Sequence, residues 1–308
     1  MQGIVIKSTG SWFRVATTDK KEYECRIKGK FRLKGIKTTN PVAVGDKVLF
    51  ELEDNEETGI INTILDRKNY IIRKSVNLSK QAQILAANID QAFLLITIDN
   101  PPTFTGFIDR FLVSSEAYHI PTVLVFNKID EVRKDEYLSY QLETMKAIYS
   151  QIGYECLEIS AKEHINIDLI KAKMQGKVST FAGHSGVGKS TLVNAIESSL
   201  NLKTKAISTS HSQGQHTTTF AAMYPLSFGG YIIDTPGIKG FGLVDMEKED
   251  LDHYFPEFFK RKELCKFNNC LHFNEPNCAV KAAVEKEEIA YSRYESYLQM
   301  LEDDQNYR

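Results

Sequence analysis

The order of five short motifs constrains the fold of this chain more than any other feature. Asn-Lys-Ile-Asp at 127–130 comes first, and Ser-Ala-Lys at 160–162 follows. Next come the loop Gly-His-Ser-Gly-Val-Gly-Lys-Ser at 183–190, three threonines at 217–219 and Asp-Thr-Pro-Gly at 234–237. The loop is a phosphate-binding pattern, which needs a strand before it and a helix after it. We therefore expect an α/β domain with nucleotide motifs at the carboxyl ends of its strands.

The motif order also indicates how this domain is connected. An ordinary GTP-binding domain begins with the phosphate loop and ends with the guanine-reading motifs, whereas here the guanine-reading motifs come first. The sequence therefore predicts a circularly permuted P-loop GTPase domain. Permutation moves the segments that sense the γ-phosphate to the end of the domain. The residues after 237 are therefore candidates to receive the nucleotide signal.

The phosphate loop has the required context, with a strand expected at 177–182 and a helix at 190–196. Its backbone N–H groups would bind phosphate oxygens. Lys189 would act as a catalytic charge on the β- and γ-phosphates, and the Ser190 hydroxyl would bind Mg²⁺. Asp234 ends another apolar run, where its carboxylate can hold Mg²⁺ through water.

The Asn-Lys-Ile-Asp motif would select the base. It follows an apolar strand expected at 122–126, and the Asp130 carboxylate can accept from the N1–H and 2-amino groups of guanine. Adenine lacks that donor pair, so the carboxylate would be left unpaired at a cost of roughly 1–3 kcal/mol. Lys128 would lie along the base plane, and the Ala161 N–H would donate to the guanine oxygen. A guanine-nucleotide site is predicted.

Two further groups are expected around the γ-phosphate. The Gly237 N–H would meet this phosphate, and one threonine of 217–219 would complete the Mg²⁺ shell. Thr218 is the candidate, although the residues alone leave all three threonines open. The nucleotide-binding residues predicted from these motifs are Asn127, Lys128, Ile129, Asp130, Ser160, Ala161, Lys162, Gly183, His184, Ser185, Gly186, Val187, Gly188, Lys189, Ser190, Thr191, Asp234 and Gly237.

A turn-rich stretch near the C-terminus carries three cysteines and a histidine: Cys265, Cys270, His272 and Cys278. Three thiolates and one imidazole suit a closed tetrahedral zinc site, which is structural because no position remains for water. One structural Zn²⁺ per chain is predicted. The alternative is a small core cluster of cysteines with an incidental histidine.

The first 66 residues have the pattern of a small β-barrel, because short alternating segments are separated by turn residues. This spacing is typical of an OB-fold. Five cations fall at every second position: Arg26, Lys28, Lys30, Arg32 and Lys34. They would share one face of an extended strand, and with Trp12 and Phe13 as stacking partners that face could bind RNA. The alternative is a solvated strand face over core aromatics.

Composition fits a protein of several domains. The chain has 308 residues, 42% of them hydrophobic, and a net charge of −2, so it is not a polycation. Its first residues read as a strand rather than a targeting leader, and its apolar runs are too short to span a bilayer. A cytosolic protein is expected, in which cysteines are reduced thiols or metal ligands. Cys25 and Cys156 are interpreted as ordinary buried thiols.

Three domains are expected, an OB-type RNA-binding barrel, a permuted GTPase domain and a zinc-binding helical module, at 1–66, 67–245 and 246–308. Residues 63–80 are interpreted as a linker, and 91–98 as the first strand of the GTPase sheet. Helices are predicted at 246–257 and 279–304. The second of these has an apolar stripe formed by Tyr291, Tyr294, Leu298 and Leu301.

Together these features resemble the family of small-subunit-dependent ribosomal GTPases called RsgA. The resemblance covers essentially the whole chain and rests on Gly-His-Ser-Gly-Val-Gly-Lys-Ser-Thr at 183–191, Gly-Gln-His-Thr-Thr-Thr at 214–219, Asp-Thr-Pro-Gly at 234–237 and the zinc ligands. It implies a late-acting assembly factor that binds the small ribosomal subunit and its rRNA. Such a factor hydrolyses GTP with stimulation by the subunit and leaves on hydrolysis. A monomer that does not associate with membranes is expected.

The residue after Asp-Thr-Pro-Gly bears on catalysis. Many GTPases place a glutamine there to orient the attacking water, but this chain has Ile238, which cannot form a hydrogen bond through its side chain. Slow intrinsic hydrolysis is expected. His216, beside the threonines, is the internal candidate to orient the water, because imidazole can accept a proton near neutral pH. A structural or ribosome contact is the alternative role for His216.

Two other functions stay open on the sequence. One is a nucleotide-gated RNA-binding module in which hydrolysis is incidental. The other is a phosphotransferase that uses the same loop on a small acceptor. The threonine triplet and Asp-Thr-Pro-Gly argue against the phosphotransferase, since a small-molecule kinase does not need these switch segments.

Overall fold

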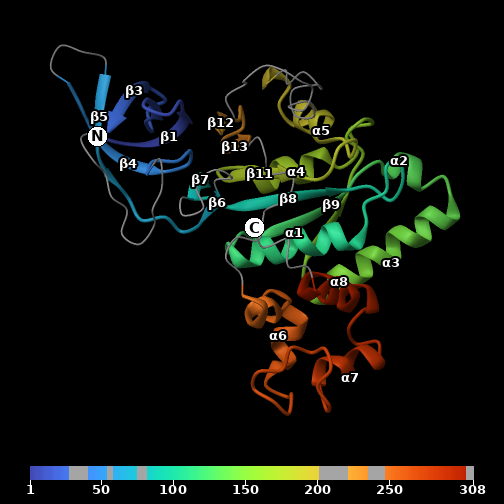
Figure 1. Cartoon of the computed structure of the whole chain (residues 1–308). Coiled ribbons are helices and arrows are strands. Elements are labelled where there is room, and N and C mark those ends of the chain that lie inside the picture. The colour runs from blue at the N-terminus through green and yellow to red at the C-terminus, as the bar shows by residue number, and fades with distance from the viewer. Residues whose placement is uncertain (28–40, 54–57, 75–81, 201–220, 235–246, 303–308) are drawn as a thin grey trace, which may run out of the picture.

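The computed structural model describes residues 1–27, 41–53, 58–74, 82–200, 221–234 and 247–302. These residues form a small barrel, a central α/β part and a helical module (Figure 1). No helix in these ranges combines the length and the apolar character that crossing a membrane requires.

The N-terminal part is a five-stranded barrel, as predicted. Its strands are β1 (Gln2–Ser8), β2 (Phe13–Ala16), β3 (Glu22–Ile27), β4 (Lys47–Leu52) and β5 (Thr58–Ile64). They pair in the order β1-β2-β3-β5-β4, and β4 returns to pair with β1, which closes the barrel. Alternate side chains such as Val5, Val15 and Ile61 fill its interior.

The barrel corrects part of the predicted RNA-binding face. Phe13 is fully buried in the barrel core, so it cannot stack on a base, whereas Trp12 beside it is 42% exposed. Arg26 forms an ion pair with Glu53. The remaining predicted cations lie outside the described residues: Lys28, Lys30, Arg32 and Lys34.

The central sheet has the strand order β10-β9-β8-β11-β13-β12, and all neighbours are parallel except β13 and β12. Its strands are β8 (Gln91–Ile96), β9 (Thr122–Phe126), β10 (Glu155–Glu158), β11 (Val178–Ala182), β12 (Ala222–Pro225) and β13 (Tyr231–Asp234). The strands predicted around 91–98, 122–126 and 177–182 are confirmed. Of the isolated cysteines, Cys25 is buried as predicted, while Cys156 in β10 is only partly buried.

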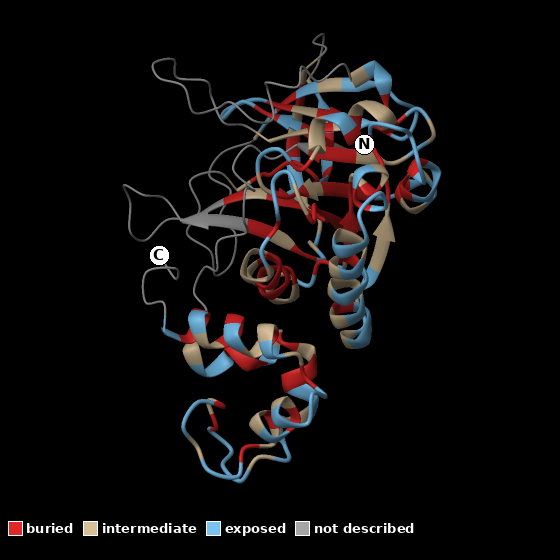
Figure 2. Ribbon diagram, turned by 90° about the vertical axis from the view of Figure 1, so that its right-hand side faces the viewer, coloured by how far each residue is buried: buried red, intermediate tan, exposed pale blue. Residues whose placement is uncertain are grey.

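Helices cover both faces of this sheet: α1 (Thr105–Ala117), α3 (Glu136–Ile152), α4 (Ile167–Met174) and α5 (Lys189–Ile196), with the short η1 (Ser198–Leu200) after α5. Leu94 and Ile96 of β8 belong to the core that includes α1 and α3, and Phe93 and Leu95 belong to the core that includes α4 and α5. Figure 2 shows the buried strands between helices whose outer faces are exposed. A strand covered on both faces needs apolar side chains at every position, which explains the continuous run at 92–96.

The parallel strands bring the motifs to one edge of the sheet. β9 leads into 127–130, β10 leads towards 160–162, β11 leads into 183–190, and β13 ends at Asp234. Because these four strands are parallel members of one sheet, their carboxyl ends lie at the same edge. The permuted order in the sequence therefore does not disturb the spatial arrangement of the site.

The segment expected to be a linker at 63–80 is instead partly structured, so that prediction was wrong. A hairpin of β6 (Tyr70–Lys74) and β7 (Ala82–Ala87) leads into the central sheet. Ile71 and Ala86 are buried in the core on the α1 side of the sheet. These buried contacts, which local composition does not reveal, order the segment.

Specific hydrogen bonds attach the barrel to this hairpin and to the residue after it. The Ala87 N–H donates to the Val44 carbonyl at 2.9 Å, and Asn88 Nδ2 donates to the Gly45 carbonyl at 3.0 Å. Arg67 binds both carboxylate oxygens of the fully buried Asp46 at 2.6 Å each. These contacts therefore fix the position of the barrel on the hairpin that leads into the central sheet.

The C-terminal module contains η2 (Lys248–Tyr254), α6 (Pro256–Lys262), α7 (Ala279–Glu285) and α8 (Tyr291–Glu302). Two sequence predictions fail here. The helix expected at 246–257 is a 3₁₀ helix followed by α6, which starts at Pro256. The single helix expected at 279–304 is broken into α7 and α8, and Glu287 in the break has a left-handed φ of 60°.

The predicted apolar stripe of α8 is confirmed only in part. Leu301 is buried and Tyr294 and Leu298 pack against the same core, but Tyr291 is 68% exposed. The buried residues of the helix are Arg293, Ser296, Tyr297, Met300 and Leu301. The largest departure from the prediction is Arg293, a charged residue at a core position. Its guanidinium is fully buried and binds Asp109 of α1 at 2.7 Å and Glu257 of α6 at 2.7 Å. Hydrophobic periodicity cannot predict a buried ion pair of this kind.

Candidate nucleotide site and metal centre

Asn127 joins three of the motifs. Its side chain is buried at the end of β9, where Nδ2 donates to the Val187 carbonyl at 2.8 Å. Its Oδ1 accepts from the Ala161 N–H at 3.0 Å. The first motif thereby holds the phosphate loop on one side and the Ser-Ala-Lys turn on the other. These contacts fix the distance between the phosphate-binding and base-reading ends of the site.

Ala161 also contacts Asn127. The Ala161 N–H donates to Asn127 Oδ1 in this structure, and its predicted donation to the guanine oxygen stays a prediction. Ala161 therefore positions Asn127 here. Ser160, also fully buried, orders the same turn because its hydroxyl accepts from the Glu163 N–H at 3.1 Å. The Lys162 side chain is 74% exposed and lies 3.6 Å from the Glu163 carboxylate.

The phosphate loop depends on glycine at three positions with left-handed φ: Gly183 at 138°, Gly186 at 86° and Gly188 at 97°. A Cβ on Gly188 would lie 2.4 Å from Asn127 Nδ2, and one on Gly183 would lie 2.8 Å from the Leu95 carbonyl oxygen. These positions therefore need glycine for close approach as well as for backbone conformation. Within the loop, Val187 is fully buried and Ser185 is exposed.

The loop ends at α5, whose first residue is Lys189. Its ammonium donates to the Gly183 and His184 carbonyls, each at 2.7 Å. Ser190 and Thr191 occupy the first turn of this helix, where unpaired N–H groups favour an anion. Lys189 and Ser190 therefore lie at the helix start that follows the loop, and their phosphate and Mg²⁺ contacts stay predictions.

His184 connects the loop to α1. In the neutral ring its Nδ1 donates to the Ser185 carbonyl at 3.0 Å, because that oxygen can only accept. Nε2 then accepts from the Thr103 hydroxyl at 2.7 Å. The imidazole also meets the Phe107 ring edge-on, with centroids 5.7 Å apart.

The segment 99–103 forms a wall of the site that the sequence did not predict. The Lys128 ammonium donates to the Asn100 carbonyl, and a Cβ on Gly186 would lie 3.0 Å from Pro101 Cδ. No motif marks this segment. Its position after β8, at the same edge as the other motifs, was the available signal.

The base-reading carboxylate lies at the start of a short helix, α2 (Ile129–Val132). Asp130 is half-buried, and it has no hydrogen-bond or ion-pair partner within the described part of the chain. Lys128 before it has a left-handed φ of 64°, which turns the chain from β9 into α2. The buried Ile129 anchors that turn.

Several predicted site residues cannot be placed. For Asp234 the structure gives only the backbone, at the end of β13. The others lie outside the described residues: His216, Thr217, Thr218, Thr219, Gly237 and Ile238. The described site therefore comprises the base-reading side and the phosphate loop.

The four predicted metal ligands converge. One donor atom from each of Cys265, Cys270, His272 and Cys278 lies within 4.8 Å of the other three. His272 Nδ1 is 3.3 Å from the Cys278 sulfur and 3.7 Å from the Cys265 sulfur, and these two sulfurs are 4.0 Å apart. Tetrahedral zinc would place its sulfurs about 3.8 Å apart and sulfur and nitrogen about 3.6 Å apart. The donor set and its spacing fit a zinc ion.

The four candidate metal ligands come from three parts of the helical module. Cys265 follows α6, Cys278 caps α7, and a turn carries Cys270 and the fully buried His272. Burial raises the pKa of the Cys270 thiol to about 12. This thiol can ionise near neutral pH only beside a cation, which is consistent with a metal centre.

Two family models match the chain in succession. The model for the RsgA N-terminal domain matches residues 2–61, and the model for the RsgA GTPase matches residues 64–244. Similar proteins named small ribosomal subunit biogenesis GTPase RsgA occur in Flavobacterium johnsoniae and Christiangramia forsetii. The first is 63% identical over 311 residues, covering 100% of this chain and 95% of the relative. The second is 61% identical over 311 residues, covering 100% and 98%.

Two solved structures are similar over nearly the whole chain. The crystal structure of YjeQ from Thermotoga maritima has a TM-score of 0.78 and 37% identity, and the match covers 97% of this chain and 96% of YjeQ. The structure of YloQ, described as a circularly permuted GTPase, has a TM-score of 0.75 and 30% identity. That match covers 97% of this chain and 93% of YloQ.

Proposed function

The chain belongs to the RsgA family of GTPases, and from this premise we propose that it assists a late step of small ribosomal subunit biogenesis. In this proposal it binds the subunit with GTP, hydrolyses GTP to GDP and phosphate there, and leaves after hydrolysis. The observation that carries the proposal is the Asn127 bridge, which brings the base-reading motif, the Ser-Ala-Lys turn and the phosphate loop into one site.

Each part of the site has a proposed role in the reaction. Asp130 accepts from the guanine edge, and the loop N–H groups with Lys189 hold the phosphates. Ser190, Asp234 and one threonine, Thr218 in our assignment, hold Mg²⁺. This ion supplies charge compensation on the β- and γ-phosphate oxygens when it is bound.

Lys189 already points across the loop, towards the Gly183 and His184 carbonyls at 2.7 Å. A bound phosphate would compete for its ammonium. Lys189→Ala should therefore abolish turnover, whereas Lys162→Ala, which removes an exposed ammonium in the Ser-Ala-Lys turn, should lower it far less. Phosphate release and calorimetric GTP titration measure both effects. Normal turnover in Lys189→Ala would mean that this loop is not the active site.

His216 is proposed to orient the attacking water in place of the glutamine that Ile238 replaces. His216→Ala should then lose subunit-stimulated turnover and keep its GTP and subunit affinities. If His216 only contacts the ribosome, the same variant would lose subunit affinity. Measuring turnover and co-sedimentation on one preparation separates these roles.

The partners and organisation follow from the same proposal. The small subunit and its rRNA are the proposed partners of a monomer that acts in the cytoplasm, and one structural Zn²⁺ is proposed at the Cys3His cluster. We propose domains at 1–66, 67–245 and 246–308. The end of β5 at Ile64 and the change from sheet to helical module after β13 support these boundaries.

The decisive experiment measures GTP turnover with and without purified small subunits, with large subunits as a control. Strong stimulation by small subunits alone is expected. A nucleotide-gated RNA-binding module would show GTP-dependent subunit binding without stimulation. Phosphate transfer to a small acceptor would instead indicate a kinase.

A further inference from the structure

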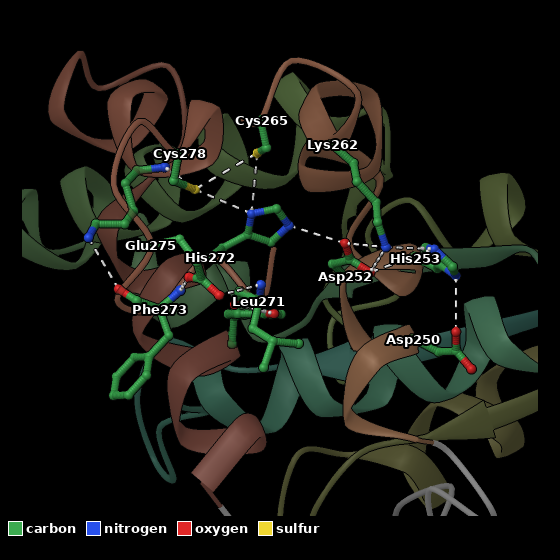
Figure 3. Close-up of polar contacts among 12 residues, drawn as sticks. Asp250, Asp252, His253, Lys262, Cys265, Leu271, His272, Phe273, Glu275 and Cys278 are labelled. Atoms are coloured by element: carbon green, nitrogen blue, oxygen red, sulfur yellow. Dashed lines mark hydrogen bonds and ion pairs between the residues drawn. The ribbon is translucent and has the colours of Figure 1, made fainter. Parts of the chain in front are cut away.

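Asp252 supports the metal centre from outside it. This carboxylate lies on η2 and is 2% exposed, and its Oδ2 is 3.1 Å from Nε2 of the fully buried His272 (Figure 3). Lys262 of α6 donates to the same carboxylate at 2.8 and 2.9 Å. Because the Lys262 ammonium pairs with this carboxylate, a hydrogen-bond acceptor is held facing the imidazole.

This contact determines which ring nitrogen of His272 carries the hydrogen and which has a lone pair facing the cysteines. Because a carboxylate only accepts, Nε2 carries the hydrogen and Nδ1 keeps its lone pair. Nδ1 is the atom that faces the Cys265 and Cys278 sulfurs, at 3.7 and 3.3 Å. Metal-binding histidines commonly donate their second N–H to a carboxylate, which fixes the tautomer and ring orientation.

The location of Asp252 gives the contact a second consequence. η2 is the first element that the structure describes after the Asp-Thr-Pro-Gly motif, and ten residues separate Gly237 from Lys248. Leu251 and Phe255 beside it are fully buried in a core that includes Val113 of α1. The first described helix after the predicted γ-phosphate-sensing motif is thus bonded directly to a predicted metal ligand.

We propose that Asp252 is a positioning residue that orients His272 for zinc and makes zinc occupancy stabilise η2, the element that follows the phosphate-sensing motif. The proposal rests on the zinc and nucleotide sites proposed above. Zinc binding requires Nδ1 of His272 to stay aimed at the sulfurs, and the Asp252 contact provides this. Conversely, a metal-fixed His272 gives η2 a buried anchor.

The first test is zinc affinity of the full chain, measured by competition with a chromogenic chelator. Asp252→Ala should raise the zinc Kd about 10- to 100-fold, and Asp252→Asn, whose amide oxygen can still accept, should raise it less. The matched control is Asp250→Asn on the same helix. Asp250 is exposed and lies 3.6 Å from His253, not against His272. Wild-type zinc affinity in Asp252→Ala would overturn the proposal.

Lys262→Met separates this role from a simple ion pair. If Asp252 matters only as the partner of Lys262, both Lys262→Met and Asp252→Ala should weaken zinc binding equally, which would overturn the proposal. The positioning role predicts a clearly larger loss in Asp252→Ala.

The second test is amide hydrogen exchange over 248–254. Removing zinc from the wild type should accelerate exchange there, and in Asp252→Asn the difference between zinc-loaded and zinc-free protein should shrink. Equal protection of η2 with and without zinc in the wild type would contradict the coupling. Binding of a fluorescent GDP analogue is measured in parallel. If the wild type does not bind the analogue, that result counts against the proposed GTPase site and leaves the zinc result unchanged.

Discussion

At the scale of single residues, the Asn127 side chain connects the separate motifs of the nucleotide site. Both ends of its amide are used within the protein, at 2.8 Å to Val187 and 3.0 Å to Ala161. Gly188 faces the same amide so closely that a Cβ would lie 2.4 Å from Nδ2. The motifs are thus linked by hydrogen bonds across 60 and 34 residues of sequence.

If Asp130 selects the base, as we propose, Asp130→Asn should exchange guanine preference for xanthine. The substitution replaces an acceptor with a donor opposite the 2-position, where xanthine has an oxygen instead of an amino group. We expect GTP affinity to fall by at least 10-fold, which corresponds to about 1.4 kcal/mol. Calorimetry with GTP, XTP and ATP measures the shift. Glu131→Gln, an exposed neighbour, should change none of the three affinities.

Residues in contiguous motifs could be predicted because their chemistry is local. The loop at 183–190 and the metal ligands, for example, each lie within a few turns of chain. Thr103, Asn100 and Asp252 were missed because their roles depend on distant partners. Thr103, for instance, bonds to His184 across 81 residues of sequence. Phe13 was misassigned because an aromatic beside a turn looks the same whether it points into a barrel or out of it.

At the scale of elements, Glu197 fastens the end of α5 to the turn after β12. Its carboxylate accepts from Ser199 Oγ at 2.6 Å and from the Ser227 N–H at 2.8 Å. The first of these hydrogen bonds contributes most to lowering the pKa of Glu197, from 4.5 to about 2. Because the folded-state pKa is depressed, the stabilisation is present above pH 4.5 and is lost as the pH falls towards 2.

Glu197→Gln should therefore lower the free energy of unfolding at pH 7. The difference in this free energy between the variant and the wild type should become smaller as the pH falls from 4.5 to 2. Urea unfolding across this range measures the difference. Glu295→Gln, an exposed residue on α8, is the control and should leave stability nearly unchanged at every pH. A deficit for Glu197→Gln that stays constant with pH would refute the assigned pKa.

α8 shows why it is easier to predict that a segment is helical than to predict which of its faces is buried. Its helical character was predicted from the sequence, but the predicted stripe lies at the edge of the buried face, with Leu301 buried and Tyr291 exposed. Arg293 occupies the core between Asp109 and Glu257, with its guanidinium 4.5 Å from the centre of the Phe255 ring. The hairpin at 70–87 was missed for a related reason, because its order comes from packing on the sheet and not from a turn motif.

Arg293→Met should destabilise the attachment of the helical module by about 3–5 kcal/mol, because it leaves two buried carboxylates without their cation. Urea unfolding and limited proteolysis between residues 286 and 302 measure the loss. Arg261→Met removes a more exposed partner of Glu288, at 3.2 Å, and should cost about 1 kcal/mol or less. Equal effects of the two substitutions would mean that the buried network does not anchor the module.

At the scale of the whole molecule, α1 and the residues just before it contact both the phosphate loop and the helical module. Thr103, two residues before α1, and Phe107 in its first turn contact His184 of the phosphate loop, and Asp109 of the same helix binds Arg293 of the helical module. On the other side, the barrel is seated on the hairpin before β8. The central domain therefore contacts the barrel through the hairpin before β8 and the helical module through α1.

The last prediction concerns the contact between the barrel and the hairpin of β6 and β7. Gly45 has a φ of 91°, and a Cβ there would lie 2.1 Å from the Ala87 carbonyl oxygen, so Gly45→Ala should push the barrel off the hairpin. Basal GTP turnover should persist, because the described nucleotide-site residues lie at the far end of the central strands. Stimulation by small subunits should fall several-fold, since the barrel can no longer contact the subunit while the sheet is engaged.

Gly229→Ala is a matched control for this experiment. Gly229 has the same φ of 91°, but a Cβ there would meet no atom within 4 Å, so the substitution adds the backbone strain without the clash. Stimulated and basal turnover are measured for both variants at several salt concentrations, because a barrel that contacts rRNA contributes a salt-sensitive share of binding. If Gly45→Ala retains full stimulation, the fixed position of the barrel is unnecessary for coupling to the subunit. If Gly229→Ala loses as much, backbone strain and not the barrel seat explains the effect.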